Sequence, residues 1–280
     1  MKKLSMTAPT AVRQPYIKVL AENEDARIVY IALILDMSGS MQHLQKTVFE
    51  AAQRLLAALI DKTNEDFEYR VQVIVFNDSV RPIVTDYLPP EQVSELFTER
   101  DYVCDGGTDL TGVVQYMDEH MFTRSAPLAQ HLHRSDPKAV SVIITDYVGT
   151  DDENSRSKAL NVLSTNRLFT KASNCICILC GSAAGPEDVL PLCGSRDNVV
   201  KLDPKLDFAS ILAPVLIGST LVLGDGTHLR TGDEQDQTPA EVAEKQSERA
   251  ASGQQGADTL TKEELAQAMA DMFKDVNLTV

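Results

Sequence analysis

An uninterrupted apolar run at residues 28–35 is the feature that most constrains how this chain can fold. The run is rich in β-branched side chains and reads Ile-Val-Tyr-Ile-Ala-Leu-Ile-Leu. Such a run is typical of a strand that is buried on both faces of a sheet. It is followed by Asp36-Met37-Ser38-Gly39-Ser40, after which a helical pattern begins. Open α/β sheets bind ligands at the carboxyl ends of their strands, so this turn is the first candidate site.

Strand and helix patterns alternate through most of the remaining chain, which predicts right-handed crossovers and a mainly parallel sheet. A short strand at 80–84 is expected to be an antiparallel edge strand, because Pro82 is tolerated there. We therefore predict an α/β, Rossmann-like, doubly wound fold, with a mostly parallel central sheet, one short antiparallel edge strand and helices on both faces. The further strands are expected at 69–76, 139–145, 174–180 and 198–202, and the helices at 44–59, 90–97, 110–121, 154–171 and 208–217.

The composition divides the chain into four parts. Residues 1–26 are a polar lead-in, 27–223 are the folded domain, and 224–259 are expected to be a flexible acidic and polar linker. Residues 260–277 are predicted to form an amphipathic helix that starts at a capping box, Thr261–Glu264. This helix either folds back on the domain or binds in a groove of a partner.

The charge balance argues against several classes of protein. The 280 residues include 26 Lys and Arg against 41 Asp and Glu, which gives a net charge of −15. An acidic surface repels phosphate groups, so we expect no nucleic-acid partner. No apolar run reaches the roughly 18 residues that span a bilayer, and the amino terminus lacks the apolar segment of a signal peptide. We expect a cytoplasmic protein without a membrane partner.

Oxygen-bearing side chains recur at three predicted strand ends or loops: Asp36-x-Ser38-x-Ser40, Thr108 after two glycines, and Asp146 after a buried strand. Their order and spacing strongly resemble the metal-ion-dependent adhesion site (MIDAS) of von Willebrand factor A domains, over about residues 28–220. Within that group the chain looks most similar to intracellular bacterial proteins of the tellurite-resistance TerY type. The second Asp loop, residues 145–152, carries much of this likeness, although Tyr147 stands where glycine is usual and Gly149 where proline is common.

The resemblance implies a role for each of these residues. Ser38 and Ser40 would bind the metal directly, Thr108 directly or through water, and Asp36 and Asp146 through coordinated waters or hydrogen bonds to the serines. Short oxygen ligands suit Mg²⁺, with Mn²⁺ as an alternative. Two carboxylates leave part of the cation's charge unneutralised, so an open coordination position would attract an acidic group of a partner. We expect the partner-binding rim to consist of Met37, Gly39, Met41, His43, Gly107, Asp109 and Tyr147.

Other chemistry-bearing residues have simpler interpretations. Cys175-x-Cys177-x-x-Cys180, followed by Cys193, could indicate zinc or redox chemistry. The cysteines partly alternate between the two faces of a strand, so they cannot all converge, and we predict buried free thiols. His131 and His133 are expected on the surface. Asp109 or Thr108 is expected to cap the helix that follows, with Asp109 favoured as a cap over a role near the metal.

We found no motif for nucleophilic catalysis. The chain has no Gly-x-Ser-x-Gly elbow, Walker A loop or Gly-x-Gly-x-x-Gly, and Ser38 replaces the second Asp of a haloacid-dehalogenase-like phosphatase. We predict a non-enzymatic protein-interaction module. By resemblance, its partners would be kinase and phosphatase proteins of tellurite-resistance-type systems, in stress response or phage defence. The alternatives are an adaptor for a MoxR-type AAA+ ATPase, a structural subunit of a larger assembly, and a metal-dependent phosphohydrolase without an identifiable nucleophile. The acidic segment 225–248 could also offer a carboxylate to the chain's own metal.

Overall fold

The computed structural model describes residues 27–63, 67–124, 126, 138–147, 150–181, 186–202, 212–217 and 220. The predicted lead-in, linker and C-terminal helix therefore lie outside the described residues, as do His131 and His133. In the part of the chain that is described, no helix combines the length and the apolar character needed to cross a membrane.

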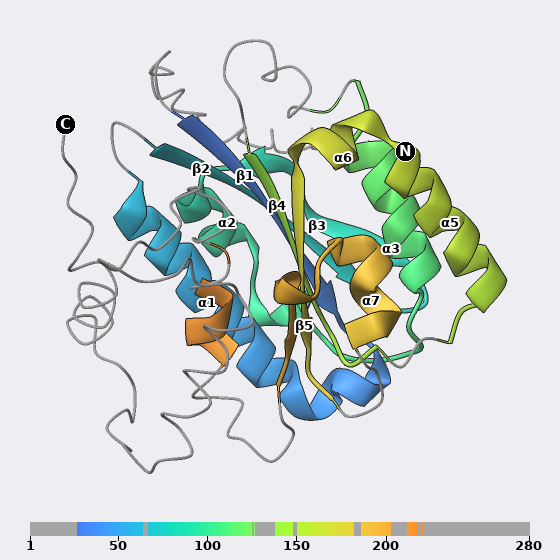
Figure 1. The fold of residues 1–280 in the computed structure, drawn as a ribbon. Coiled ribbons are helices and arrows are strands. Elements are labelled where there is room, and N and C mark those ends of the chain that lie inside the picture. The colour runs from blue at the N-terminus through green and yellow to red at the C-terminus, as the bar shows by residue number, and fades with distance from the viewer. Residues whose placement is uncertain are drawn as a thin grey trace, which may run out of the picture.

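A six-stranded sheet forms the centre of the described structure, with strand order β3-β2-β1-β4-β5-β6. All neighbouring pairs are parallel except β2 and β3, which are antiparallel. This arrangement confirms the predicted fold class and places the apolar run that opens the domain in the interior of the sheet (Figure 1). The strands are β1 (Arg27–Asp36), β2 (Phe67–Phe76), β3 (Val80–Leu88), β4 (Lys138–Thr145), β5 (Ser173–Leu179) and β6 (Val199–Lys201).

Strand β1 is buried on both faces, as its sequence predicts. Alternate side chains belong to opposite hydrophobic clusters, so that Leu33 and Leu35 point to one face, and Tyr30 and Ile34 to the other. Its two neighbours, β2 and β4, are parallel and in register with it, and Leu35 pairs with both Val75 and Ile144. The carboxyl ends of these three strands therefore meet at one edge of the sheet.

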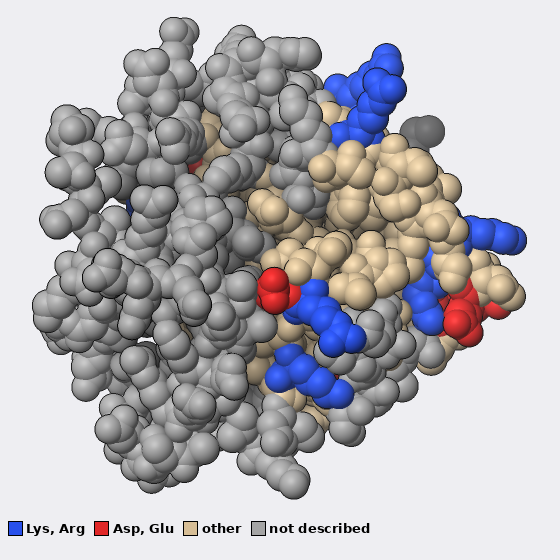
Figure 2. All heavy atoms as spheres, in the orientation of Figure 1, with Lys and Arg blue, Asp and Glu red and all other residues tan. Residues whose placement is uncertain are grey.

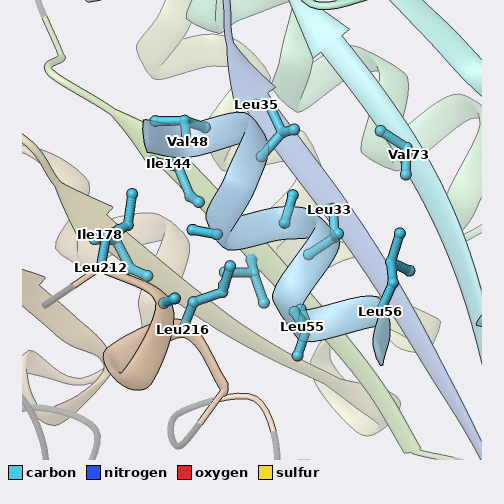
Figure 3. Packing of buried hydrophobic residues seen from close by; sticks show 14 of the residues in the cluster. Leu33, Leu35, Val48, Leu55, Leu56, Val73, Ile144, Ile178, Leu212 and Leu216 are labelled. Atoms are coloured by element: carbon cyan, nitrogen blue, oxygen red, sulfur yellow. The ribbon is translucent and has the colours of Figure 1, made fainter. Parts of the chain in front are cut away.

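Helices cover both faces of the sheet. The first cluster joins one face of the sheet to α1 (Gln45–Lys62), α2 (Pro90–Leu96) and the helical residues 212–217. Figure 3 shows Leu55 and Leu56 of α1, and Leu212 and Leu216, pointing toward strand residues such as Leu33 and Ile178. The opposite face is covered by α3 (Leu110–Tyr116), the π-helical turn Met117–Met121, α5 (Glu153–Thr165), α6 (Arg167–Ala172) and α7 (Pro186–Cys193).

The structure corrects several predicted element boundaries. The edge strand extends from Val80 to Leu88 and is longer than expected. The helix predicted over 154–171 is divided into α5 and α6 at Asn166, whose side chain donates to the Asp118 carboxylate at 2.7 Å and accepts from the Leu168 N–H at 2.9 Å. Helix α7 was not predicted, because Pro191 lies inside it and proline disfavours a helix interior.

Candidate metal centre

The turn after β1 brings two serine hydroxyls together. Asp36 ends the strand, and its carboxylate accepts the Ser38 N–H at 2.8 Å. The hydroxyl oxygens of Ser38 and Ser40 are 3.1 Å apart. A 3-10 helix, Gly39–Leu44, starts between these two serines and leads into α1. The turn therefore presents two neutral oxygen ligands next to one carboxylate.

The end of β4 supplies a contact that the sequence analysis missed. Thr145 donates its hydroxyl to the second oxygen of the Asp36 carboxylate at 2.5 Å, and its oxygen accepts the Tyr147 N–H at 2.8 Å. Thr145 is completely buried. Leu35 of β1 pairs with Ile144 of β4, so the residues that follow them, Asp36 and Thr145, lie side by side. This contact could have been predicted only from the register of the two strands.

Residues 105–108 are joined to the serine turn by the backbone. The Asp105 N–H donates to the Met37 carbonyl at 2.8 Å, and the Gly39 N–H donates to the Gly106 carbonyl at 3.0 Å. This pairing fixes the segment that carries Thr108 against the serine turn. The Thr108 side chain is almost fully buried, at 1% exposed.

Two further residues brace the Thr108 segment from outside. The Asp78 carboxylate accepts the Gly107 N–H at 2.9 Å, and the Thr150 hydroxyl accepts the Thr108 N–H at 3.0 Å. A Cβ atom on Gly107 would lie 2.6 Å from Asp78 Oδ1 and 2.7 Å from Thr150 Oγ1, closer than real Cβ contacts. An alanine at position 107 would therefore require the Asp78 and Thr150 side chains to move. Thr150 belongs to the second Asp loop, residues 145–152, whereas Asp78 carries no motif that would identify it in the sequence.

The loop after β4 is held by a buried acidic side chain. The Asp151 carboxylate accepts the Thr111 N–H at 2.9 Å and the Thr111 hydroxyl at 2.5 Å, and it pairs with Arg156 at 2.9 Å. The Arg156 guanidinium lies over the Tyr147 ring, 5.4 Å from its centroid. Tyr147 has a φ of 56°, a conformation that favours glycine, which gives a physical reason why glycine is usual at this position.

The centre concentrates negative charge in the protein interior. Burial raises the pKa of Asp36 to about 6, hydrogen bonds from Ser38 and Thr145 partly oppose that increase, and the nearby charge of Asp146 adds to it. None of these groups is positively charged, so among the described residues the Asp36 carboxylate is stabilised by hydrogen-bond dipoles. A cation at this position would supply the missing charge, and hydroxyl and carboxylate oxygens are its usual ligands.

The described residues contain no group of three or more His, Cys, Asp or Glu side chains that could hold a metal ion. A cation site at this edge would therefore need neutral oxygen ligands, and the family resemblance implies the hydroxyl groups of Ser38, Ser40 and Thr108 for that role. The donor set of the centre, three hydroxyls with two carboxylates, matches that requirement. Such a set favours a small, hard cation that keeps several of its waters.

The structure places most predicted residues around this edge. Asp36, Ser38, Thr108 and Asp146 are buried, whereas Ser40 is exposed. Of the predicted rim, Gly39 and His43 are exposed, and Gly107, Asp109 and Tyr147 are half-buried. Asp109 caps α3, because its carboxylate accepts the Gly112 N–H at 2.8 Å.

Two rim predictions are corrected by the burial of the side chains. Met41 is completely buried, and Met37 is 8% exposed. Both belong to the hydrophobic cluster beneath α1. The turn directs these side chains into the core, so they cannot contact a partner.

Comparison with known proteins agrees with the fold. The von Willebrand factor type A domain family matches residues 31–150. A von Willebrand factor type A structure from Catenulispora acidiphila is 18% identical, with a TM-score of 0.50, and the match covers 70% of this chain and 42% of that one. Proximal thread matrix protein 1 from the mussel byssus, in a structure with a zinc-occupied MIDAS motif, is 14% identical with a TM-score of 0.51, covering 70% and 48%.

These likenesses establish the fold and no more, because the identities are low. The chain spans less than half the length of either solved structure. No curated protein matches the sequence.

Proposed function

We propose that this chain, of which residues 31–150 match the von Willebrand factor type A domain family, binds a divalent cation at the carboxyl edge of its sheet and, through that cation, an acidic side chain of a partner protein. The observation that carries the proposal is the buried Asp36 carboxylate. It accepts hydrogen bonds from Ser38 and Thr145, and the groups that most affect its pKa include no positive charge.

In this proposal, the hydroxyls of Ser38, Ser40 and Thr108 are the direct ligands. Asp36 and Asp146 hold coordinated waters and orient the serines. The Ser38 and Ser40 oxygens are already 3.1 Å apart, so the turn needs little rearrangement to direct both at one ion. Such preorganisation lowers the cost of binding.

Mg²⁺ is the cation that we propose, with Mn²⁺ as the alternative. Neutral hydroxyls and few carboxylates suit an ion that keeps part of its hydration shell. The zinc-occupied MIDAS of the mussel protein is a property of that protein. It makes Zn²⁺ a necessary comparison in any metal titration of this chain.

The exposed side of the centre is where a partner would bind. Gly39, Ser40 and His43 are exposed there, and the His43 ring is held by a 2.9 Å hydrogen bond between Nδ1 and the Ser40 carbonyl. Three neutral ligands leave the cation electron-poor, so a partner carboxylate would complete its coordination. This chemistry requires no catalytic group in the chain, and we propose a non-enzymatic, cytoplasmic adaptor.

The class of partner rests on the resemblance to TerY-type proteins. We propose a kinase or phosphatase of a bacterial stress-response, tellurite-resistance or phage-defence system, with a MoxR-type AAA+ ATPase as the alternative. A structural subunit with an incidental metal site is the contrasting possibility. Only an adaptor of either kind requires the metal to bind its partner. Metal-dependent partner binding therefore distinguishes an adaptor from a structural subunit.

The test is capture of partners from native lysate by the full chain in Mg²⁺ and in EDTA, with Ser40→Ala and Ser79→Ala variants. Ser40 is an exposed proposed ligand, and Ser79 is an exposed serine in the turn between β2 and β3. The proposal predicts that wild type and Ser79→Ala capture the same partner protein in Mg²⁺ and do not capture it in EDTA. Ser40→Ala is expected to capture no partner even in Mg²⁺. Equal capture in EDTA, or by Ser40→Ala, would instead support the structural subunit.

A further inference from the structure

The buried thiols of the protein are part of its hydrophobic core. All five cysteines are free and buried, as predicted. Cys177 and Cys180 belong to hydrophobic clusters on opposite faces of the sheet. Within the described chain, no group of three Cys, His, Asp or Glu side chains is arranged to hold a metal ion. The cysteines therefore act as small apolar residues of the core.

Charged side chains are scattered over the face of the molecule that Figure 2 shows. Among the described residues of that face, acidic and basic groups occur singly or in small groups, without one extended patch of either sign. Long-range attraction of a partner needs a concentration of one sign of charge. On this face, short-range geometry would therefore decide where a partner binds.

The exposed ring of His43 is bonded to the turn that carries the proposed metal ligands. Its Nδ1 atom lies 2.9 Å from the carbonyl oxygen of Ser40. A carbonyl oxygen can only accept a hydrogen bond, so the proton of the neutral ring is on Nδ1 and not on Nε2. The His43 ring therefore donates to the backbone of Ser40.

Ser40 and His43 lie on one exposed face of the short helix after β1. Both belong to the 3-10 helix Gly39–Leu44, three residues apart, and both are exposed. A 3-10 helix has three residues per turn, so side chains three residues apart are eclipsed. The His43 ring is therefore placed beside Ser40, where it can restrict the movement of that residue.

Burial holds Ser40 less firmly than the other two proposed hydroxyl ligands. Ser38 and Thr108 are each 1% exposed, and their N–H groups donate to side chains of the protein. Ser40 is exposed, and its hydroxyl oxygen lies 3.1 Å from that of Ser38. The bond from His43 to the Ser40 carbonyl is thus the contact that fixes this residue from the solvent side.

We propose that His43 is a positioning residue of the metal centre, which holds the turn around Ser40 in the conformation that binds the cation. The inference rests on the proposed function, because it takes Ser40 as a direct ligand. Hydrogen bonds that orient metal ligands before the ion arrives reduce the ordering that binding requires. In this arrangement His43 acts through Ser40 and is not itself a ligand.

Two substitutions separate the effect of the hydrogen bond from that of the ring. His43→Phe keeps an aromatic ring without a donor, whereas His43→Asn places an amide N–H₂ at the position of Nδ1 without the ring. In calorimetric titration of the full chain, we expect His43→Phe to bind Mg²⁺ about three- to tenfold more weakly than wild type. His43→Asn should restore the affinity to within about twofold of wild type, because the donor is present again.

His120 provides the matched control. It is also exposed, but it lies on the π-helical turn Met117–Met121, in a different part of the chain from the serine turn. His120→Phe is expected to bind Mg²⁺ as wild type does. Circular dichroism and thermal unfolding in EDTA show whether each variant is folded.

The tautomer of His43 is a second measurement that needs no metal. Nitrogen-15 NMR of the folded, metal-free chain identifies which ring nitrogen carries the proton, and His43→Phe assigns the signals. We expect the proton on Nδ1, as the bond to Ser40 requires. A proton on Nε2 of the neutral ring would overturn the proposal.

The outcomes distinguish this inference from the proposed function. Mg²⁺ binding that is lost in Ser40→Ala but unchanged in His43→Phe would overturn the role of His43 alone. So would a His43→Asn protein that binds as weakly as His43→Phe, because the ring and not the hydrogen bond would then matter. Absence of Mg²⁺ binding to folded wild type would contradict the proposed function itself.

Discussion

The Thr145 hydroxyl donates a 2.5 Å hydrogen bond to the buried carboxylate of Asp36, and so links the carboxyl ends of β4 and β1. The other oxygen of that carboxylate accepts the Ser38 N–H at 2.8 Å. The strand ends and the serine turn are thus fixed relative to each other by one side chain. The geometry of the proposed metal centre depends on the network around Asp36.

Replacing Thr145 with valine should weaken this network without changing the side chain's shape. The hydroxyl's bonds to Asp36 and from the Tyr147 N–H are lost, and we expect a loss of roughly 1–3 kcal/mol in the free energy of unfolding. Urea denaturation in EDTA measures the change in the free energy of unfolding. Thr165→Val is the control, because that hydroxyl is exposed and its change should stay within about 0.5 kcal/mol. Equal effects of the two changes would show that the Thr145 bonds add nothing to stability.

Asp36→Asn should stabilise the metal-free protein at neutral pH. Burial raises the pKa of Asp36 from 3.8 to about 6, so the folded state binds the proton more tightly than the unfolded state. Its contribution to stability is present below pH 3.8 and is lost as the pH rises through about 6. Asparagine does not titrate, so it removes the cost of the buried charge, but its single amide oxygen can accept only one of the two hydrogen bonds from Ser38 and Thr145. At pH 7 in EDTA we therefore expect a net gain over wild type that is smaller than the roughly 3 kcal/mol of the pKa shift alone.

The same substitution should remove the response to metal. Wild type is expected to gain thermal stability in Mg²⁺, because a cation that binds only the folded state stabilises it by mass action. Asp36→Asn should unfold at the same temperature in Mg²⁺ and EDTA. An Asp36→Asn protein less stable than wild type in EDTA at pH 7 would contradict the assignment of Asp36 as a buried carboxylate whose charge destabilises the metal-free fold.

Gly107→Ala should displace the Thr108 segment. The added methyl group would meet Asp78 Oδ1 at 2.6 Å and Thr150 Oγ1 at 2.7 Å, so both braces must move. We expect a loss of about 1–3 kcal/mol in unfolding free energy, as for other overpacked sites, and weaker Mg²⁺ binding. Gly39→Ala is the steric control, because its nearest contact would be an ordinary 3.4 Å. If Gly107→Ala were as stable as wild type, the Asp78 and Thr150 side chains would have moved aside at little energetic cost.

Asp151→Asn tests the partly buried ion pair between Asp151 and Arg156, in the region that follows β4. Asparagine keeps an acceptor for Thr111 but loses the charge that pairs with Arg156, whose side chain is only 19% exposed. We expect a loss of about 1.5–3 kcal/mol on denaturant unfolding. Glu50→Gln, in the exposed Lys46–Glu50 pair, should cost less than about 0.5 kcal/mol. Similar losses in both variants would contradict the importance of burial.

The sequence predicts the sheet well because burial on both faces leaves a strong pattern. The run that ends at Asp36 is typical of a strand buried on both faces, and it lies inside the sheet. Helix ends are less predictable, because they depend on single contacts. Asn166 divides a continuous helical pattern through bonds to Asp118 and the Phe122 carbonyl, which are remote in sequence.

The candidate metal centre was likewise predictable from the sequence only in part. Its proposed ligands follow a recognisable spacing, and the strand order brings their segments to one edge. Thr145 and Thr150 lie in the second Asp loop, but the sequence does not show their roles as braces or that of Asp78, because these roles arise only from tertiary contacts. Met37 and Met41 were misassigned to the rim because a turn sequence does not show which side chains face the core.

Isothermal titration calorimetry of the metal-free chain with Mg²⁺ tests the central claim most directly. We predict one saturable site in wild type and in Ser79→Ala, with at least a tenfold loss of affinity in Ser40→Ala, whose exposed side chain can be removed with little effect on the fold. Parallel titrations with Mn²⁺ and Zn²⁺ identify the preferred ion. Absence of saturable binding of any of the three ions to folded wild type, or equal affinity in Ser40→Ala, would contradict the account.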